Sequence, residues 1–325
     1  MMDRRTFILA VGALLAASLD ARAQPVAKVY RIGILEPIPA AQNAANLDAL
    51  RKGLRNFGYV EGRNLIIEYR SADGHADRFP DLAAELVRLK IDLLLTRGTP
   101  ATRAAKRATE TIPVVMATMG DPRPIVASFA HPGGNVTGVT TFSTELAAKR
   151  LELLKELVPK LSRVGLVHNM GNPAAPPEWE EIRTAAQSLG LQAELFDVRN
   201  RADLGRAIDL AVRQHVDALV IGADGLIQAN QQTVIGLASR NNLPATYPAR
   251  EFVEAGGLIA YAVNYPDLYF RLATLVDKIF KGAKPGEIPV EQPTKFELVF
   301  NLKTAKMLGL ELPQSLRLRA DEVIQ

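Results

Sequence analysis

From about residue 28 onward, short apolar runs alternate with amphipathic segments, and this alternation restricts the possible fold more than any other feature of the chain. Residues 29–35 form the first apolar run, and Leu47, Leu50 and Leu54 then recur at helical spacing before Gly58. Strands that alternate with helices in this way are typical of a parallel sheet with helical connections. The pattern therefore predicts an α/β fold.

The alternation restarts in the middle of the chain. The segment 135–141 has strand-forming residues but no helix of its own, and a second series of strands and helices follows it. We therefore expect two Rossmann-like lobes with parallel sheets rather than one large sheet. The predicted strands are 29–35, 64–69, 91–95, 112–117, 163–168, 191–196, 218–221 and 243–247. After the helix that Gly58 closes, the predicted helices are 79–89, 99–108, 145–157, 178–189, 201–214, 230–241, 265–281 and about 302–308.

The first 23 residues have the composition of an export signal. Arg4 and Arg5 give a positive start, residues 7–19 form an apolar run, and a small-x-small cleavage site ends at Ala23. The apolar run is shorter than the roughly 20 residues that span a bilayer. We expect residues 1–23 to be a signal peptide, cleaved near Ala23 to leave a soluble periplasmic protein. A buried N-terminal helix is the alternative.

The export route stays open between two systems. The pair Arg4-Arg5 resembles the twin-arginine signal of the Tat route. Asp3, however, stands where that signal usually has Ser or Thr, so the Sec route is equally compatible with the sequence.

Composition and missing motifs exclude several classes of protein. The net charge is only +4 and no run of Lys or Arg exceeds two residues, so we expect no nucleic-acid partner. The chain has no cysteine, which excludes disulfides, thiolate nucleophiles, Cys-ligated metals and a lipid anchor on an N-terminal Cys. G-x-G-x-x-G after the first strand, the Walker pattern, H-E-x-x-H and G-x-S-x-G are also missing. We therefore expect no cofactor, no metal site and no catalytic residues.

The candidate ligand residues follow the predicted strands. In sheets wound with helices, ligands bind beyond the carboxyl ends of the strands, near free N–H groups of helix N-termini. We expect Thr99, with Pro100 following at the first helical position, to begin a helix that can bind a carboxylate. The alternative is that Thr99, Asp121, Asn169 and Asp224 only cap helices and turns. The full set of candidates is Glu36, Gly98, Thr99, Gly120, Asp121, Thr141, Asn169, Asp224 and Tyr247.

Several longer motifs resemble those of a known family. They are GYVEGRN at 58–64, HPGGNVTG at 131–138, RLELLKEL at 150–157, EAGGL at 254–258 and VEQPTKFEL at 290–298. With these motifs, residues 30–325 resemble the ABC-transporter substrate-binding proteins of the TrpX-like family, which have the type I periplasmic-binding-protein fold. The chain departs from the family pattern at 36–39 and 121–125, two loops that we expect at the ligand cleft.

The resemblance implies two lobes joined by three crossovers, with a ligand cleft between them. Residues 28–140 with about 266–289 would form the N-terminal lobe, and residues 141–265 with about 290–325 the C-terminal lobe. Hinge segments are expected near 140–141, 261–265 and 290–294. By position, the family's site would include Gly98, Thr99, Asp121 and Asp224.

The function that the resemblance implies is the solute-binding component of an ABC importer. The ligand would be an amino acid or a small aromatic or carboxylic acid, bound by hinge closure and delivered to a membrane permease with its ATPase. Helix N-termini at Thr99 and near Asp121 would hold a carboxylate, and Asp224 would accept from an amine or hydroxyl. We expect a monomer that contacts the membrane only through the permease. The alternatives are a ligand-sensing periplasmic module for a membrane receptor and a secreted small-molecule hydrolase.

Overall fold

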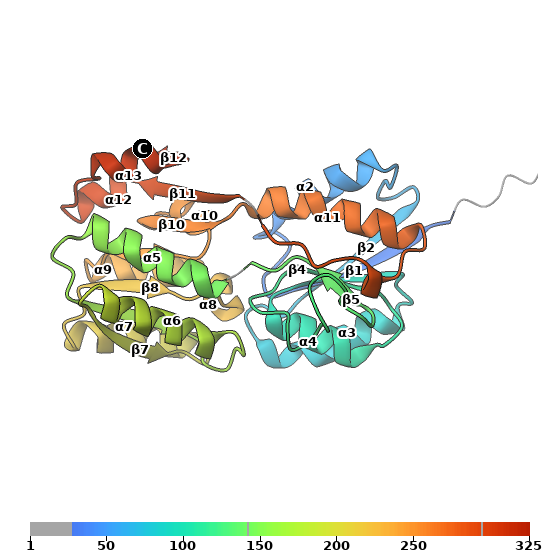
Figure 1. Ribbon diagram of the computed structural model, residues 1–325, viewed down its shortest axis with the longest axis horizontal. Helices are drawn as coiled ribbons and strands as arrows, with labels where there is room; N and C mark the ends of the chain where they lie inside the picture. Colours follow the sequence, from blue (N-terminus) through green and yellow to red (C-terminus); the bar gives the residue numbers. More distant parts are fainter. Residues whose placement is uncertain (1–27, 142, 294) are drawn as a thin grey trace, which may run out of the picture.

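The computed structural model describes residues 28–141, 143–293 and 295–325. The predicted signal peptide, residues 1–23, lies outside them. The described chain forms two lobes that lie side by side along the long axis of the molecule (Figure 1). Each lobe contains one β-sheet, and one sheet is five-stranded while the other is seven-stranded. The two α/β lobes confirm the fold class expected from the sequence.

The N-terminal lobe is built on the five-stranded sheet. Its strand order is β2-β1-β3-β4-β5, and all its pairs are parallel. The strands are β1 (Tyr30–Glu36), β2 (Leu65–Ser71), β3 (Leu93–Arg97), β4 (Val114–Thr118) and β5 (Val136–Gly138). The helices are α2 (Ala44–Asn56), α3 (Phe79–Arg88), α4 (Thr99–Ala108) and α11 (Tyr265–Phe280), with short 3-10 turns at Ala76–Arg78 and Pro285–Glu287.

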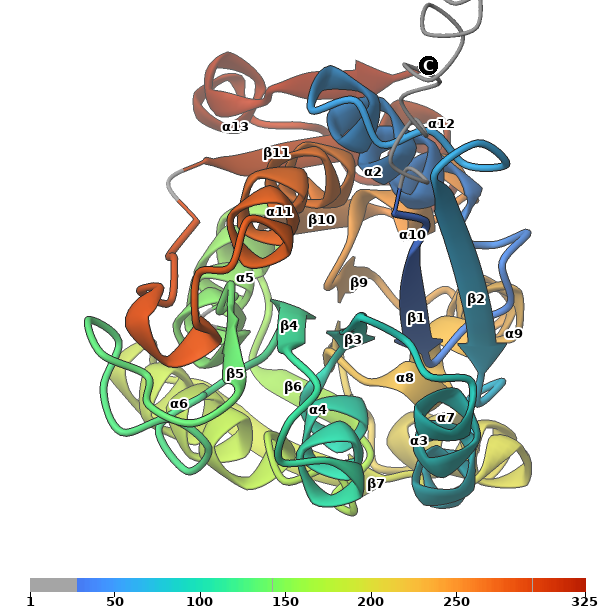
Figure 2. The same ribbon diagram turned by 90° about the vertical axis from the view of Figure 1, so that its right-hand side faces the viewer.

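Both faces of this sheet are covered, because its strands are apolar on both sides. Ile34 and Leu95 face a core shared with α2 and α11, whereas the neighbouring Leu35 and Leu94 face a core shared with α3 and α4. Figure 2 shows these two helix pairs on opposite sides of the sheet. Such continuous apolar runs are expected of parallel strands buried on both faces. Helix α11 is far from α2 in sequence, so the chain returns to this lobe after building most of the other one.

The C-terminal lobe is built on the seven-stranded sheet, in the order β12-β11-β10-β9-β8-β6-β7. Its strands are β6 (Arg163–His168), β7 (Gln192–Asp197), β8 (Ala218–Ile221), β9 (Ala245–Tyr247), β10 (Ile259–Val263), β11 (Phe296–Asn301) and β12 (Glu322–Ile324). Its helices are α5 (Ser143–Leu157), α6 (Ala175–Ser188), α7 (Arg201–Arg213), α8 (Gly225–Ala229), α9 (Gln231–Arg240), α10 (Arg250–Glu254), α12 (Leu302–Met307) and α13 (Gln314–Arg319).

One pair of strands in this sheet departs from the expected parallel arrangement. Strands β10 and β11 are antiparallel, with Tyr261 opposite Leu298. The chain leaves the lobe at the end of β10, passes through α11, and returns at the same end of the sheet, so β11 has to run in the opposite direction. Six elements were not among the strands and helices predicted from the sequence: β10, β11, β12, α8, α10 and α13.

The first and third passages between the lobes lie side by side. The backbone N–H of Glu291 donates to the carbonyl of Gly138 at 2.8 Å, and the N–H of Thr140 donates to the carbonyl of Glu291 at 3.0 Å. Arg271 on α11 forms a 3.0 Å ion pair with the carboxylate of Glu291. These contacts tie the passage after β5 to the passage before β11.

A helix cap in the C-terminal lobe gives a first testable prediction. The Asn200 side chain accepts hydrogen bonds from the N–H groups of Ala202 and Asp203, and the Asp203 carboxylate accepts from the N–H of Asn200, which completes a capping box. We expect Asn200→Ala to lower the free energy of unfolding by about 1 kcal/mol in chemical denaturation. Asn200→Ser retains a capping hydroxyl and serves as the control. An equal loss in both variants would contradict a capping role.

Candidate ligand site between the lobes

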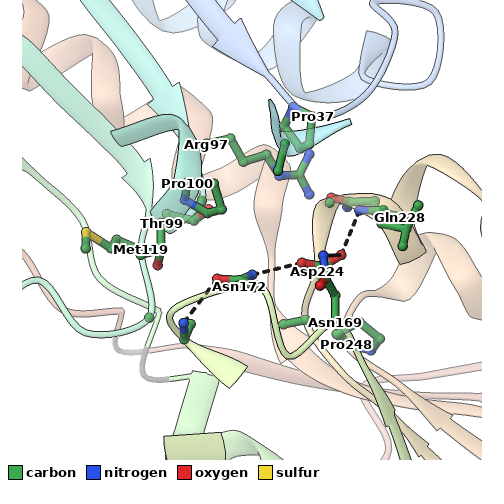
Figure 3. A pocket seen from close by; sticks show the side chains of 18 of the residues that line it. Pro37, Arg97, Thr99, Pro100, Met119, Asn169, Asn172, Asp224, Gln228 and Pro248 are labelled. Carbon is green, nitrogen blue, oxygen red and sulfur yellow. Dashed lines mark hydrogen bonds between the residues drawn. The ribbon is translucent and has the colours of Figure 1, made fainter. Parts of the chain in front are cut away.

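A cleft open to solvent lies between the two lobes. It is formed where the carboxyl ends of strands from both sheets meet, as expected for ligand sites in wound sheets. Figure 3 shows Pro37, Arg97, Thr99, Pro100 and Met119 on one side and Asn169, Asn172, Asp224, Gln228 and Pro248 on the other. Six of the nine candidates from the sequence line this cleft: Gly98, Thr99, Gly120, Thr141, Asn169 and Asp224.

Asp224 is the central polar group on the C-terminal side. It caps the N-terminus of α8, because its Oδ1 accepts a hydrogen bond from the N–H of Leu226 at 2.8 Å. Asn172 donates to Oδ2 of Asp224 at 2.9 Å, and Asn169 donates to Oδ1 at 3.5 Å. The capping interpretation of Asp224 is thus correct, and the same carboxylate also lines the cleft.

The N-terminal side presents the start of α4. Gly98 is the cap residue, with a φ of +85° that favours glycine, and Thr99 is the first helical residue. The prediction that Pro100 occupies the first helical position is therefore wrong by one residue. Helix α4 still begins at the cleft, and its first N–H groups have no partner within the helix.

Arg97 is the main lining residue that is absent from the sequence-based candidates. Its side chain is 3% exposed, lies 4.3 Å from the ring centroid of Tyr265, and donates through Nη1 to Oδ1 of Asn43 at 3.3 Å. Its Nη2 has no hydrogen-bond partner in the described part of the chain. The available signal was a cation at the end of an otherwise apolar run, directly before Gly98 and Thr99.

Glu36 does not line the cleft, in contrast to the prediction. Its carboxylate is fully buried behind Arg97, where Tyr269 donates a hydrogen bond to it and Nη1 of Arg97 is 4.0 Å away. Burial raises the pKa of Glu36, and the nearby charge of Arg97 offsets only part of this effect. Burial also lowers the pKa of Arg97, but Tyr269 and Glu36 outweigh that effect and raise it, so Arg97 stays charged. Glu36 thus lies behind Arg97 and outside the cleft.

Asp121 and Tyr247, two further predicted ligand residues, do not line the cleft either. The Asp121 carboxylate forms a two-point pair with Arg123, with both distances at 2.9 Å, and this pairing lowers the pKa of Asp121. Residues 122–126 form a turn, so in the described chain no helix begins directly after Asp121. Tyr247 is 2% exposed and stacks on Phe252 within the C-terminal lobe, with ring centroids 5.2 Å apart. Its strand turns this side chain into the core, away from the cleft.

A buried charge network supports the C-terminal side of the cleft. Glu178 on α6 lies 3.3 Å from Nε2 of His168 and 3.6 Å from Nη1 of Arg150, and all three side chains are at most 1% exposed. The His168 ring packs against the backbone of Gly222, so closely that a Cβ at that position would lie 2.2 Å from the ring. The network thus lies against the loop that presents Asp224.

The described residues include neither a metal-binding cluster nor a membrane-spanning helix. Residues 28–141, 143–293 and 295–325 contain no group of three or more His, Cys, Asp or Glu placed to hold a metal ion. Within the same ranges, every helix is too short or too polar to cross a membrane.

Comparisons with known proteins agree with this architecture. Residues 31–324 match the family model for the ABC transporter substrate binding protein. The chain belongs to this family. A protein from Clostridioides difficile (strain R20291) described as a tyrosine-binding protein is 27% identical over 284 residues, which cover 86% of this chain and 80% of the relative. The resemblance to the TrpX-like substrate-binding proteins is thereby confirmed.

Two solved structures show the same fold over nearly the whole chain. A conserved domain protein from Vibrio cholerae gives a TM-score of 0.85 at 26% identity, with 91% of this chain and 100% of that chain covered. A protein from Streptococcus pneumoniae, solved in complex with L-Trp, gives a TM-score of 0.83 at 27% identity with the same coverage. Members of this family are substrate-binding proteins that take small ligands and work with an ABC permease, and they are not enzymes.

Proposed function

We propose that this protein is the periplasmic solute receptor of an ABC importer and that it binds an amino acid or a small aromatic or carboxylic acid. The observation that carries the proposal is the cleft, which brings together the start of α4 from one lobe and Asp224 from the other. The helix start at Thr99 would attract a carboxylate, because the free N–H groups and the helix dipole favour an anion there. Asp224 would accept from an amine or hydroxyl.

The apolar part of the cleft supports an aromatic or aliphatic ligand. Pro37, Phe79 and Met119 line it on one side, and Leu226 and Pro248 on the other. The relatives described as binding tyrosine and L-Trp carry large apolar side chains on their ligands. An apolar wall with a few polar groups at fixed positions is typical of a small-molecule site.

We further propose that the ligand closes the cleft by a hinge motion between two lobes. The lobes would comprise residues 28–140 with about 266–289, and residues 141–265 with about 290–325. Bending would occur near 140–141, 261–265 and 290–294, because those segments connect the two sheets. A ligand that touches both lobes favours the closed state by its differential affinity. The monomeric protein would then deliver the ligand to the permease and its ATPase.

A thermal-shift screen of the protein lacking residues 1–23 tests the binding proposal. We expect at least one of the twenty amino acids or a small aromatic acid to stabilise the folded state. A ligand at about 100 times its Kd adds about 2.7 kcal/mol to the free energy of unfolding. Neutral sugars serve as the control set and should give no shift. The absence of stabilisation by any member of the panel would contradict the proposal.

Two further measurements separate the alternatives. Recovery of the bound ligand unchanged after prolonged incubation is expected for a receptor, whereas a hydrolase would convert it. Loss of uptake of the labelled ligand in cells that lack the gene is expected for transport, whereas a sensing module would leave uptake intact.

A further inference from the structure

A second hollow lies within the C-terminal lobe, away from the cleft. It is formed by α9, α12 and the segments that lead into β9 and β10, and its lining shares no residue with the cleft. Figure 1 shows α12 at the outer end of this lobe, on the side away from the N-terminal lobe. The floor of the hollow is apolar and consists of Ile235, Ala238, Leu243, Ala245, Leu258 and Leu308. A ligand of this hollow would therefore not compete for the residues of the cleft.

Tyr247 adds one polar side chain to this apolar floor. It lines the hollow together with Ala245, which lies two residues earlier on the same face of β9. The Tyr247 ring stacks on Phe252, with ring centroids 5.2 Å apart. Its edge lies against the backbone of Gly257, where a Cβ would be 2.7 Å from Cε2. These contacts hold the ring of Tyr247 in one orientation.

The hydroxyl of Tyr247 has no hydrogen-bond partner in the part of the chain that the structure describes, although the residue is only 2% exposed. Burial alone raises the pKa of this hydroxyl, with no contribution from a neighbouring charge. A buried tyrosine hydroxyl normally has a partner, because an unmade hydrogen bond costs the desolvation of the group. Since Tyr247 lines the hollow, a molecule in the hollow can supply that partner.

The rest of the lining favours a neutral ligand with an aromatic ring. None of the described side chains that line the hollow is charged, so an ion would lose hydration there without gaining a counter-charge. The Thr304 hydroxyl already donates to the carbonyl of Gly256 at 2.9 Å. Met307 also lines the hollow and is 60% exposed, and the thioether of a methionine contacts aromatic rings favourably. A ring placed in the hollow would cover part of this exposed side chain.

We propose that this hollow is a second ligand site and that it takes a small neutral aromatic molecule with one hydroxyl or carbonyl group. The ring would lie on the apolar floor beside Met307, and its polar group would form a hydrogen bond with the hydroxyl of Tyr247. An apolar wall with a few fixed polar groups is typical of a small-molecule site. The proposal is independent of the receptor function, because no residue that lines the interlobe cleft takes part.

Methionine methyl groups can locate the ligand in the wild-type protein by NMR. Met307 lines the hollow and Met119 lines the cleft, so each reports on one of the two sites. With isotope-labelled methionine methyl groups and benzyl alcohol as the probe, we expect the Met307 resonance, assigned through Met307→Leu, to shift saturably while that of Met119 stays unchanged. Benzoate has the same ring and a charge, and should leave Met307 unshifted. The absence of a saturable Met307 shift, or a shift of Met119 alone, would overturn the proposal.

Substitution of Tyr247 tests the hydrogen bond to the ligand. Tyr247→Phe keeps the ring on Phe252 and removes only the hydroxyl, so folding should be preserved. Titrations that follow Met307 should show about 3- to 10-fold weaker binding of benzyl alcohol and unchanged binding of toluene, which has no hydroxyl. Tyr30→Phe is the control: it removes a hydroxyl that donates to Phe280 in the N-terminal lobe, and should bind both probes as the wild type does. Equal weakening of both probes by Tyr247→Phe, or of neither, would overturn the assigned hydrogen bond.

Discussion

Replacing Glu178 with Gln is expected to lower the free energy of unfolding by about 3–5 kcal/mol, because it removes the anion from a buried charge network. Arg150 would keep its charge in a site that is 1% exposed, and Glu178 is its ion-pair partner at 3.6 Å. Glutamine has nearly the same shape, so packing is preserved and the electrostatic loss dominates. Urea denaturation followed by circular dichroism measures the change.

The control is Glu181→Gln on the same helix α6, where the side chain is exposed. It should change stability by less than about 0.5 kcal/mol. A comparably small loss for Glu178→Gln would show that the network contributes little net free energy, as is known for some buried ion pairs.

The loss caused by Glu178→Gln should also depend on pH. Burial raises the pKa of Glu178, but His168 and Arg150 outweigh burial and lower it. The ionised Glu178 therefore adds to the free energy of unfolding above pH 4.5, the ordinary pKa of a glutamate, and this stabilisation is lost as the pH falls through the lowered pKa. Burial lowers the pKa of His168, but Glu178 outweighs burial and raises it. The contribution of His168 is complete below its ordinary value of 6.5 and is lost as pH rises through the raised pKa. The destabilisation should therefore be greatest between these two values and smaller on either side.

Local patterning predicted most elements of the fold, because each is encoded by its own residues. The predicted strands 163–168 and 218–221 and the predicted helix 99–108 coincide with β6, β8 and α4. The elements that escaped prediction depend on distant partners. Strand β11 pairs antiparallel with β10 only because the chain has crossed to the other lobe and returned. No periodicity within 296–301 records that route.

The candidate site was predictable at the level of loops but not of side-chain direction. Strand ends located the cleft correctly, because the carboxyl ends of parallel strands meet at one edge. Whether a residue at such an end faces the cleft depends on packing across the sheet, which spacing alone does not reveal. Tyr247 turns into the core beside Phe252, and Glu36 lies behind Arg97. Arg97 itself was overlooked because it ends a buried strand, a position where a cation is unusual.

Asp224→Asn is expected to weaken binding of an amine-bearing ligand about 10- to 150-fold, which corresponds to about 1.5–3 kcal/mol for one charge-assisted hydrogen bond. The substitution removes the negative charge. It also puts an NH₂ group, which cannot accept a hydrogen bond, in the place of Oδ2, unless the amide turns away from Asn172. Calorimetric titration of wild type and variant with the same amino acid measures the loss.

Folding should be preserved in this variant, so the loss can be assigned to the ligand contact. Asn caps a helix about as well as Asp, and its side-chain oxygen can still accept from the N–H of Leu226 at the start of α8. Asp197→Asn is the matched control: it also removes a carboxylate at a strand end of the same sheet, but Asp197 pairs with Arg199 outside the cleft and should leave affinity unchanged. If Asp224→Asn binds as tightly as Asp197→Asn, Asp224 serves only as the cap of α8, and the capping interpretation alone accounts for it.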